Sequence, residues 1–225
     1  MRFDLLIFDL DGTLIDSKLD LALAVNATRA NAGMEPIPHE AVYSYVGNGA
    51  PRLIRSSLGP SATERQAEEG LLYFYQYYRD HMLDNTYLYP GVRAGLDRLV
   101  QTGSRLAVLT NKPVRFSGEI IDRLGLSPLF ERVYGGNSFD TKKPDSYGLE
   151  LLLTEFDVPK ERALMVGDSS VDVLTAKNAG VASCGVTYGL QPETFEEHPP
   201  DILAHCFDDV VAAVLEAPAV AQMPT

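Results

Sequence analysis

IFDLDGTLID, residues 7–16, is the stretch that decides the fold. Its apolar run ends in two acids, Asp9 and Asp11, which are followed by Gly12. Residues 3–9 are typical of a short strand that is buried on both faces of a parallel sheet. Unpaired charge at the edge of a core is costly, so some partner must hold these two acids in place.

The same kind of apolar run recurs along the chain. Four further runs predict strands, at 104–111, 130–136, 161–168 and 182–187. Amphipathic helix patterns lie between them, at 91–103, 113–125, 146–156 and 170–180. Strands that alternate with helices of this length predict an α/β fold with a Rossmann-like, doubly wound parallel sheet.

One region interrupts the alternation. Between residues 16 and 85 we find no convincing strand, only helix patterns at 17–33, 39–47, 51–59 and 61–82. We therefore predict a core of residues 1–15 and 86–225 and an inserted, small all-helical cap of residues 16–85. The aromatic stripe of its last helix, Phe74, Tyr75 and Tyr78, is interpreted as core packing. Residues 216–225 lack periodicity and predict a frayed tail.

Composition excludes several classes of partner. The 225 residues carry a net charge of −12, which argues against nucleic acid or an anionic membrane surface. The two cysteines, Cys184 and Cys206, have no metal-ligand spacing and are predicted to be buried. No signal peptide or membrane-spanning run is evident, so we expect a cytoplasmic protein, as a monomer or a homodimer.

Polar side chains follow the predicted strands where each strand ends, and ligands of open α/β sheets bind at this edge. The residues concerned are Asp9, Asp11, Thr110, Asn111, Lys143, Asp168 and Asp172. Crowded carboxylates raise one another's pKa, and a hard cation such as Mg²⁺ removes that conflict. The hydroxyl, amide and ammonium groups suit phosphate oxygens. The sequence therefore predicts a Mg²⁺ site beside a phosphate site.

Four segments together resemble the motifs of the haloacid dehalogenase-like superfamily of phosphohydrolases. They are FDLDGTLID (8–16), LTN (109–111), KKPD (142–145) and VGDSSVD (166–172). The resemblance covers nearly the whole chain. It implies a Rossmann-like core with a small helical cap inserted after the first motif.

The resemblance also implies a role for each matching residue. Asp9 would be the nucleophile that forms an aspartyl-phosphate, and Asp11 the general acid and then the general base. The phosphate would be held by Thr110 and Lys143, with Asn111 as a helper. The Mg²⁺ ligands would be the Asp9 side chain, the Asp11 backbone carbonyl, Asp168 and, directly or indirectly, Asp172.

The cap indicates the substrate. YVGNGAPRLIRSSLG (45–59), with TNKP (110–113) and GVTYG (185–189), resembles phosphoglycolate phosphatases, which implies 2-phosphoglycolate or a similar small phosphorylated metabolite as substrate. The turn Gly47-Asn48-Gly49 precedes a helix whose free N–H groups suit a carboxylate, and Arg52 would assist.

Three alternatives remain open on the sequence. The same fold could act on pyrophosphate, a sugar phosphate or a nucleotide, or it could catalyse a phosphomutase reaction. A more distant alternative is a phospho-acceptor module without enzymatic activity.

Overall fold

The computed structural model describes residues 3–215, so the predicted tail at 216–225 lies outside the described residues. The strands are β1 (Leu5–Phe8), β2 (Ile15–Asp16), β3 (Tyr87–Leu88), β4 (Arg105–Leu109), β5 (Arg132–Tyr134), β6 (Ala163–Gly167), β7 (Ala182–Val186) and β8 (Ile202–Ala204). The α-helices are α1 (Lys18–Asn31), α2 (His39–Tyr43), α3 (Ala50–Leu58), α4 (Glu64–His81), α5 (Val92–Gln101), α6 (Val114–Arg123), α7 (Tyr147–Phe156), α8 (Ser170–Ala179) and α9 (Phe207–Leu215).

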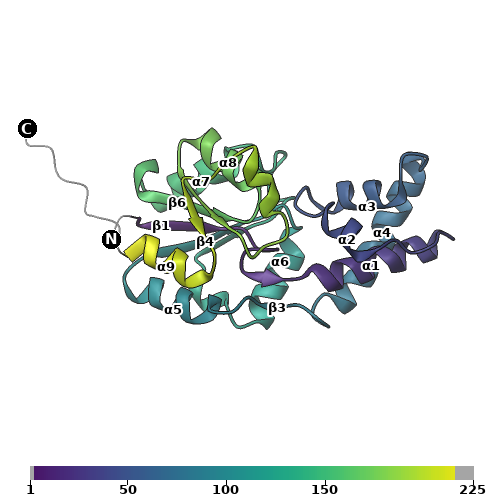
Figure 1. Cartoon of the computed structure of the whole chain (residues 1–225), viewed down its shortest axis with the longest axis horizontal. Coiled ribbons are helices and arrows are strands. Elements are labelled where there is room, and N and C mark those ends of the chain that lie inside the picture. Colours follow the sequence, from purple (N-terminus) through teal and green to yellow (C-terminus); the bar gives the residue numbers. More distant parts are fainter. Residues whose placement is uncertain (1–2, 216–225) are drawn as a thin grey trace, which may run out of the picture.

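A six-stranded parallel sheet in the order β5-β4-β1-β6-β7-β8 forms the centre of the molecule. Figure 1 shows α7 and α8 over one face of this sheet and α5 and α9 under the other. The predicted α/β fold is confirmed. Because β1 lies between β4 and β6, the carboxyl ends of these three strands meet at the switch point of the sheet, where ligands bind in such folds.

Strand β1 anchors the core on both faces of the sheet. All four of its side chains are buried. Leu6 and Phe8 belong to the apolar cluster that includes α5 and α9, whereas Leu5 and Ile7 belong to the cluster that includes α7. This alternation is the two-residue period of a strand covered on both sides, and it fixes where the chain leaves the sheet after Phe8.

Helices α1–α4 form an insert at one end of the sheet (Figure 1). The chain leaves and re-enters the core through a short antiparallel ribbon, in which Ile15 of β2 pairs with Leu88 of β3. Beside this ribbon the buried Asp20 carboxylate accepts hydrogen bonds from the Asn85 backbone N–H at 2.9 Å and the Thr86 hydroxyl at 2.7 Å. The exit and return of the insert are therefore fixed to each other.

The structure also differs from the sequence predictions. Cys184 is buried, but Cys206 is exposed, so the prediction of burial is wrong for Cys206, which precedes α9 at the surface. The short strands β2, β3 and β8 and the helix α9 had not been predicted. Within residues 3–215, no helix combines the length and the apolar character needed to span a membrane.

Candidate active site

Three buried carboxylates gather at the switch point of the sheet. Asp9 follows β1, Asp168 follows β6, and Asp172 lies in the first turn of α8. One oxygen from each lies within 4.8 Å of the others. Gly12 makes room for this cluster, because a Cβ at its position would lie 2.0 Å from Asp168 Oδ2 and its φ is +82°.

Lys143 supplies a positive charge to the cluster. Its buried ammonium lies 3.0 Å from Asp9 Oδ1 and 2.5 Å from Asp172 Oδ1. The other oxygen of Asp172 accepts hydrogen bonds from the Ser169 N–H at 3.2 Å and the Ser169 hydroxyl at 2.9 Å. Both oxygens of Asp172 are therefore engaged by protein donors.

Burial makes the ionised carboxylates of the cluster costly. Burial raises the pKa of Asp9 to about 6, although the Lys143 charge opposes the shift. Burial, with the charges of Asp172 and Asp9, raises the pKa of Asp168 well above its usual value. Burial alone would lower the pKa of Lys143, but the charges of Asp172 and Asp9 outweigh it and hold that pKa above the usual value.

The donor set fits a divalent cation. Three carboxylates face one ammonium, and Asp9 Oδ1 accepts no well-aligned hydrogen bond even with Lys143 nearby. Magnesium takes oxygen ligands of this kind and relieves the repulsion between them. The cluster is therefore suited to hold a metal ion.

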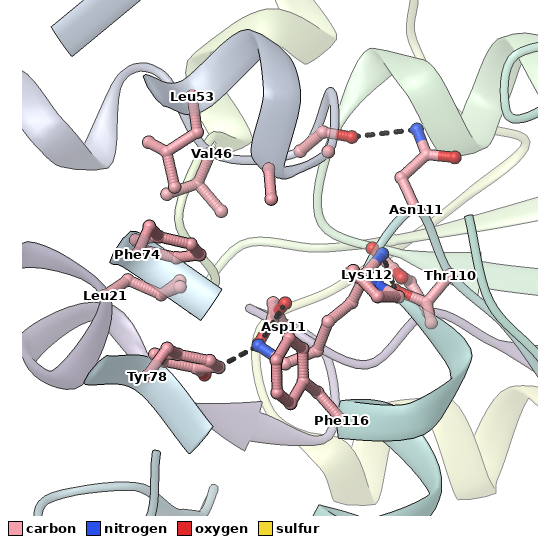
Figure 2. Close-up of a pocket in the computed structure, with 15 residues that line it drawn as sticks. Asp11, Leu21, Val46, Leu53, Phe74, Tyr78, Thr110, Asn111, Lys112 and Phe116 are labelled. Carbon is pink, nitrogen blue, oxygen red and sulfur yellow. Dashed lines mark hydrogen bonds and ion pairs between the residues drawn. The ribbon is translucent and has the colours of Figure 1, made fainter. Parts of the chain in front are cut away.

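Asp11 lies outside this cluster. Its two oxygens are 3.0 and 3.1 Å from Lys112 Nζ, and Oδ1 accepts a hydrogen bond from the Ser17 hydroxyl at 2.5 Å. Lys112 also donates to the Tyr78 hydroxyl of α4 at 2.7 Å, so the lysine joins Asp11 to the insert (Figure 2). The carboxylate of Asp11 is thus oriented toward the insert and away from the three clustered acids.

A small cavity separates the sheet edge from the insert (Figure 2). It measures about 40 Å³, room for a few water molecules when each needs about 10–15 Å³ by this measure. Core residues that line it include Asp9, Asp11, Thr110 and Lys112, and insert residues include Leu21, Val46, Gly47, Leu53, Phe74 and Tyr78. Phe74 and Tyr78 had been interpreted as packing residues, and they also form one wall of this cavity.

Amide and ammonium groups of the core hold the loop between α2 and α3. Asn111 Nδ2 donates to the carbonyls of Gly47 at 2.9 Å and Lys143 at 3.0 Å. Gln191 Nε2 donates to the carbonyls of Tyr43, Ser44 and Val46 at 3.4, 3.1 and 2.9 Å. In this structure, the insert is therefore closed over the sheet edge.

The structure brings most predicted residues of the insert to the cavity, but not all. Gly47 and Gly49 line it, and the Asn48 carbonyl accepts a hydrogen bond from Lys142 at 2.9 Å. Arg52 is exposed and lines a different hollow, between α3 and α4. Thr110 is buried at the cavity, where its hydroxyl accepts a hydrogen bond from the Lys112 backbone N–H at 3.3 Å.

Sequence reasoning missed Lys112, Gln191 and the contact of Ser17 with Asp11. Ser17 directly precedes α1, but its side chain makes no cap hydrogen bond and instead donates to Asp11. Lys112 carried a usable signal, since it directly follows the polar pair at the end of a predicted strand. Gln191 carried none, because its partners are backbone carbonyls 145 to 148 residues earlier in the chain.

Comparison with known proteins identifies the family. The family model for haloacid dehalogenase-like hydrolases matches residues 6–186. The chain belongs to the haloacid dehalogenase-like hydrolase family. The chain is 39% identical over 217 residues to a phosphoglycolate phosphatase of Vibrio parahaemolyticus, and the alignment covers 93% of this chain and 95% of the relative.

Other relatives agree with this assignment. A phosphoglycolate phosphatase of Vibrio cholerae is 38% identical over 219 residues, or 94% of this chain and 96% of the relative. The crystal structure of a predicted phosphoglycolate phosphatase from Haemophilus somnus aligns with a TM-score of 0.87 at 31% identity, over 94% of this chain and 97% of the other. The chain is a hydrolase similar to phosphoglycolate phosphatases, as the sequence motifs had indicated.

Proposed function

We propose that this protein is a Mg²⁺-dependent phosphatase that hydrolyses a small phosphate monoester, 2-phosphoglycolate, through an aspartyl-phosphate on Asp9. One observation carries the proposal: Asp9 lies in the acidic cluster, whereas Asp11, two residues later, faces the cavity and the insert. A nucleophile beside a cation site and an acid on the leaving-group side are the two groups that a double displacement at phosphorus needs.

In the first step, Asp9 attacks phosphorus and the bond to the ester oxygen breaks while Asp11 protonates that oxygen. In the second step, Asp11 removes a proton from water, and the water oxygen attacks the aspartyl-phosphate to release phosphate and free Asp9. Lys143 and Thr110 bind phosphate oxygens during both steps, since Lys143 lies 3.0 Å from Asp9 and Thr110 lines the cavity beside it.

Mg²⁺ would be held by the Asp9 side chain, the Asp11 carbonyl and Asp168. Asp172 would act indirectly, because its oxygens are engaged by Lys143 and Ser169. The ion would supply positive charge to the phosphate oxygens and to the ionised Asp9. The chain's own residues perform every proton transfer.

Residues 16–85 would act as the cap that excludes water from the reaction. We propose that the Gly47-Asn48-Gly49 turn forms its edge over the substrate, since Gly47 and Gly49 line the cavity. Both N–H groups of the Asn111 amide are taken by carbonyls, so Asn111 would help by holding this turn rather than by binding phosphate. A role for Arg52 stays a prediction.

The choice of 2-phosphoglycolate rests on the relatives' names and on the size of the cavity, which suits a short leaving group. A panel of phosphate esters, assayed with Mg²⁺ and again after chelation, tests the proposal. We expect turnover that disappears on chelation and returns with Mg²⁺, with the highest kcat/KM for 2-phosphoglycolate. Equal or higher values for pyrophosphate, a sugar phosphate or a nucleotide would exclude this substrate, and no turnover of any ester would favour a phospho-acceptor module.

A further inference from the structure

Among residues 3–215, two basic side chains are buried, Lys112 and Lys143. Lys143 lies among the clustered acids, where we place the phosphate. Lys112 lies at the cavity wall near the insert, with its side chain 4% exposed. The site therefore has one buried ammonium at the phosphate end and a second one where the leaving group of a substrate would lie.

Lys112 is the single cation among the described residues that line the cavity. The facing wall is mostly apolar and includes Leu21, Leu53 and Phe74. An anion that enters such a space without a cationic partner would lose its hydration without compensation, which costs several kcal/mol or more. Among the side chains that line the cavity, Lys112 is therefore the one whose charge compensates a negatively charged leaving group.

The ammonium of Lys112 already binds a carboxylate in the geometry that such a leaving group needs. Both oxygens of Asp11 lie about 3 Å from it, at 3.0 and 3.1 Å. The Tyr78 hydroxyl accepts from it at 2.7 Å, and the ammonium lies 4.5 Å from the centre of the Tyr78 ring. An ammonium has three N–H donors, and Asp11 and Tyr78 engage them here, so a ligand carboxylate would bind Lys112 in place of one Asp11 oxygen.

We propose that Lys112, oriented by Tyr78, is the specificity residue that binds the carboxylate of the substrate's leaving group. This inference deepens the proposed function and rests on it. The site would take small phosphate esters whose alcohol carries a carboxylate, and it would discriminate against esters of neutral alcohols of the same size. A cationic group from the core, rather than Arg52 on the outer side of the insert, would make that selection.

Binding of two phosphonates tests the proposal without turnover. 3-Phosphonopropanoate has the shape of 2-phosphoglycolate with a methylene in place of the ester oxygen, and n-propylphosphonate is its counterpart without the carboxylate. Calorimetry in Mg²⁺ should show that the wild-type protein binds the carboxylated compound roughly 10- to 100-fold more tightly, the range for a hydrogen bond to a charged group.

Lys112→Met and Lys112→Gln should reduce this ratio to about 1, while Arg52→Met should leave it unchanged. Lys112→Gln keeps a hydrogen-bond donor for Asp11, so it separates the charge of Lys112 from its support of Asp11. Thermal melting confirms that each variant folds. A ratio that survives in a folded Lys112→Gln protein, or that falls in Arg52→Met instead, would overturn the proposal.

Kinetics with 2-phosphoglycolate and its amide then separate this inference from the proposed function. If Lys112 only supports Asp11, both esters lose activity equally in Lys112→Met and the selectivity stays, which refutes the inference and leaves the phosphatase proposal intact. If the wild type selects the carboxylated phosphonate yet does not hydrolyse 2-phosphoglycolate, the assigned substrate is wrong and the role of Lys112 stands.

Discussion

Replacing Gln191 by leucine should weaken closure of the insert over the site. Gln191 is 8% exposed, and its Nε2 donates to carbonyls of the loop between α2 and α3, most closely to Ser44 and Val46 at 3.1 and 2.9 Å. Leucine has a similar volume but donates no hydrogen bond. The loop carbonyls would then lose their partner in the closed form and regain water when the insert opens.

The size of the effect follows from these two hydrogen bonds. Each net hydrogen bond contributes about 0.5–1.5 kcal/mol, so two contribute about 1–3 kcal/mol to the closed form. That free energy shifts the ratio of closed to open protein by roughly 5- to 150-fold, at a factor of ten for each 1.4 kcal/mol. Because the closed protein is the form that assembles the site, kcat/KM for 2-phosphoglycolate should decrease by a factor within that range.

Steady-state kinetics and solution scattering measure the two consequences together. Gln191→Leu should lower kcat/KM and enlarge the radius of gyration of the free protein, and a fluoride-based phosphate mimic should restore the smaller radius. Lys142→Met is the matched control, because its ammonium donates to the Asn48 carbonyl at 2.9 Å but is exposed, where water replaces it cheaply. Unchanged kcat/KM and radius in a folded Gln191→Leu protein would refute the assignment of Gln191 to closure.

Three further predictions concern the acids and Gly12. Asp11→Asn should lower kcat by roughly 10²- to 10⁴-fold with Mg²⁺ affinity retained by calorimetry; undiminished turnover would exclude Asp11 as the acid and base. Gly12→Ala should displace Asp168, because the new Cβ would lie 2.0 Å from its carboxylate, and should therefore weaken Mg²⁺ binding. Gly33→Ala is the control, since Gly33 has a φ of +72° but no neighbour within 4 Å of the added Cβ, and it should leave Mg²⁺ binding unchanged. Equal Mg²⁺ affinities of the two variants would contradict the crowding argument. Because the pKa of Asp9 is raised to about 6, the metal-free folded protein retains a proton that the unfolded chain loses above about pH 4, and its stability falls as the pH rises through that window. Mg²⁺ binds the ionised form, so it should raise the melting temperature more at about pH 7.5 than at about pH 5, and the reverse order would refute the burial argument for Asp9.

The sequence predicted what depends on strand order. The apolar runs and the acids that follow them were sufficient to place Asp9 and Asp168 together, because parallel strands end at a common edge. Asp172 could be placed as well, since it lies in the first turn of the next helix. The helices of the insert could be predicted for a different reason, because the periodicity of apolar residues along a segment decides its local structure.

The sequence did not predict what depends on contacts between the insert and the core. To predict the pairing of Lys112 with Tyr78 one must know the direction in which α4 crosses the sheet edge. The aromatic stripe of α4 does not supply it, because the same pattern is expected for core packing and for a cavity wall. Gln191 contacts backbone carbonyls, which every residue has, so no pattern of side chains marks its partners. Strands β2 and β3 contain two residues each, too few to show a two-residue period.

The central claim is that Asp9 carries a phosphoryl group during turnover. Rapid acid quenching of the Asp11→Asn protein with acetyl phosphate and Mg²⁺, followed by peptide mass analysis, tests it most directly, because the acetate leaving group does not need the acid that this variant lacks. The account predicts one phosphoryl group on the peptide that contains Asp9, stable long enough to detect because the base that activates water is absent. Two results would contradict the account. One is a phosphoryl group on another residue, and the other is turnover by the wild type while Asp9 stays unmodified at every quench time in both proteins.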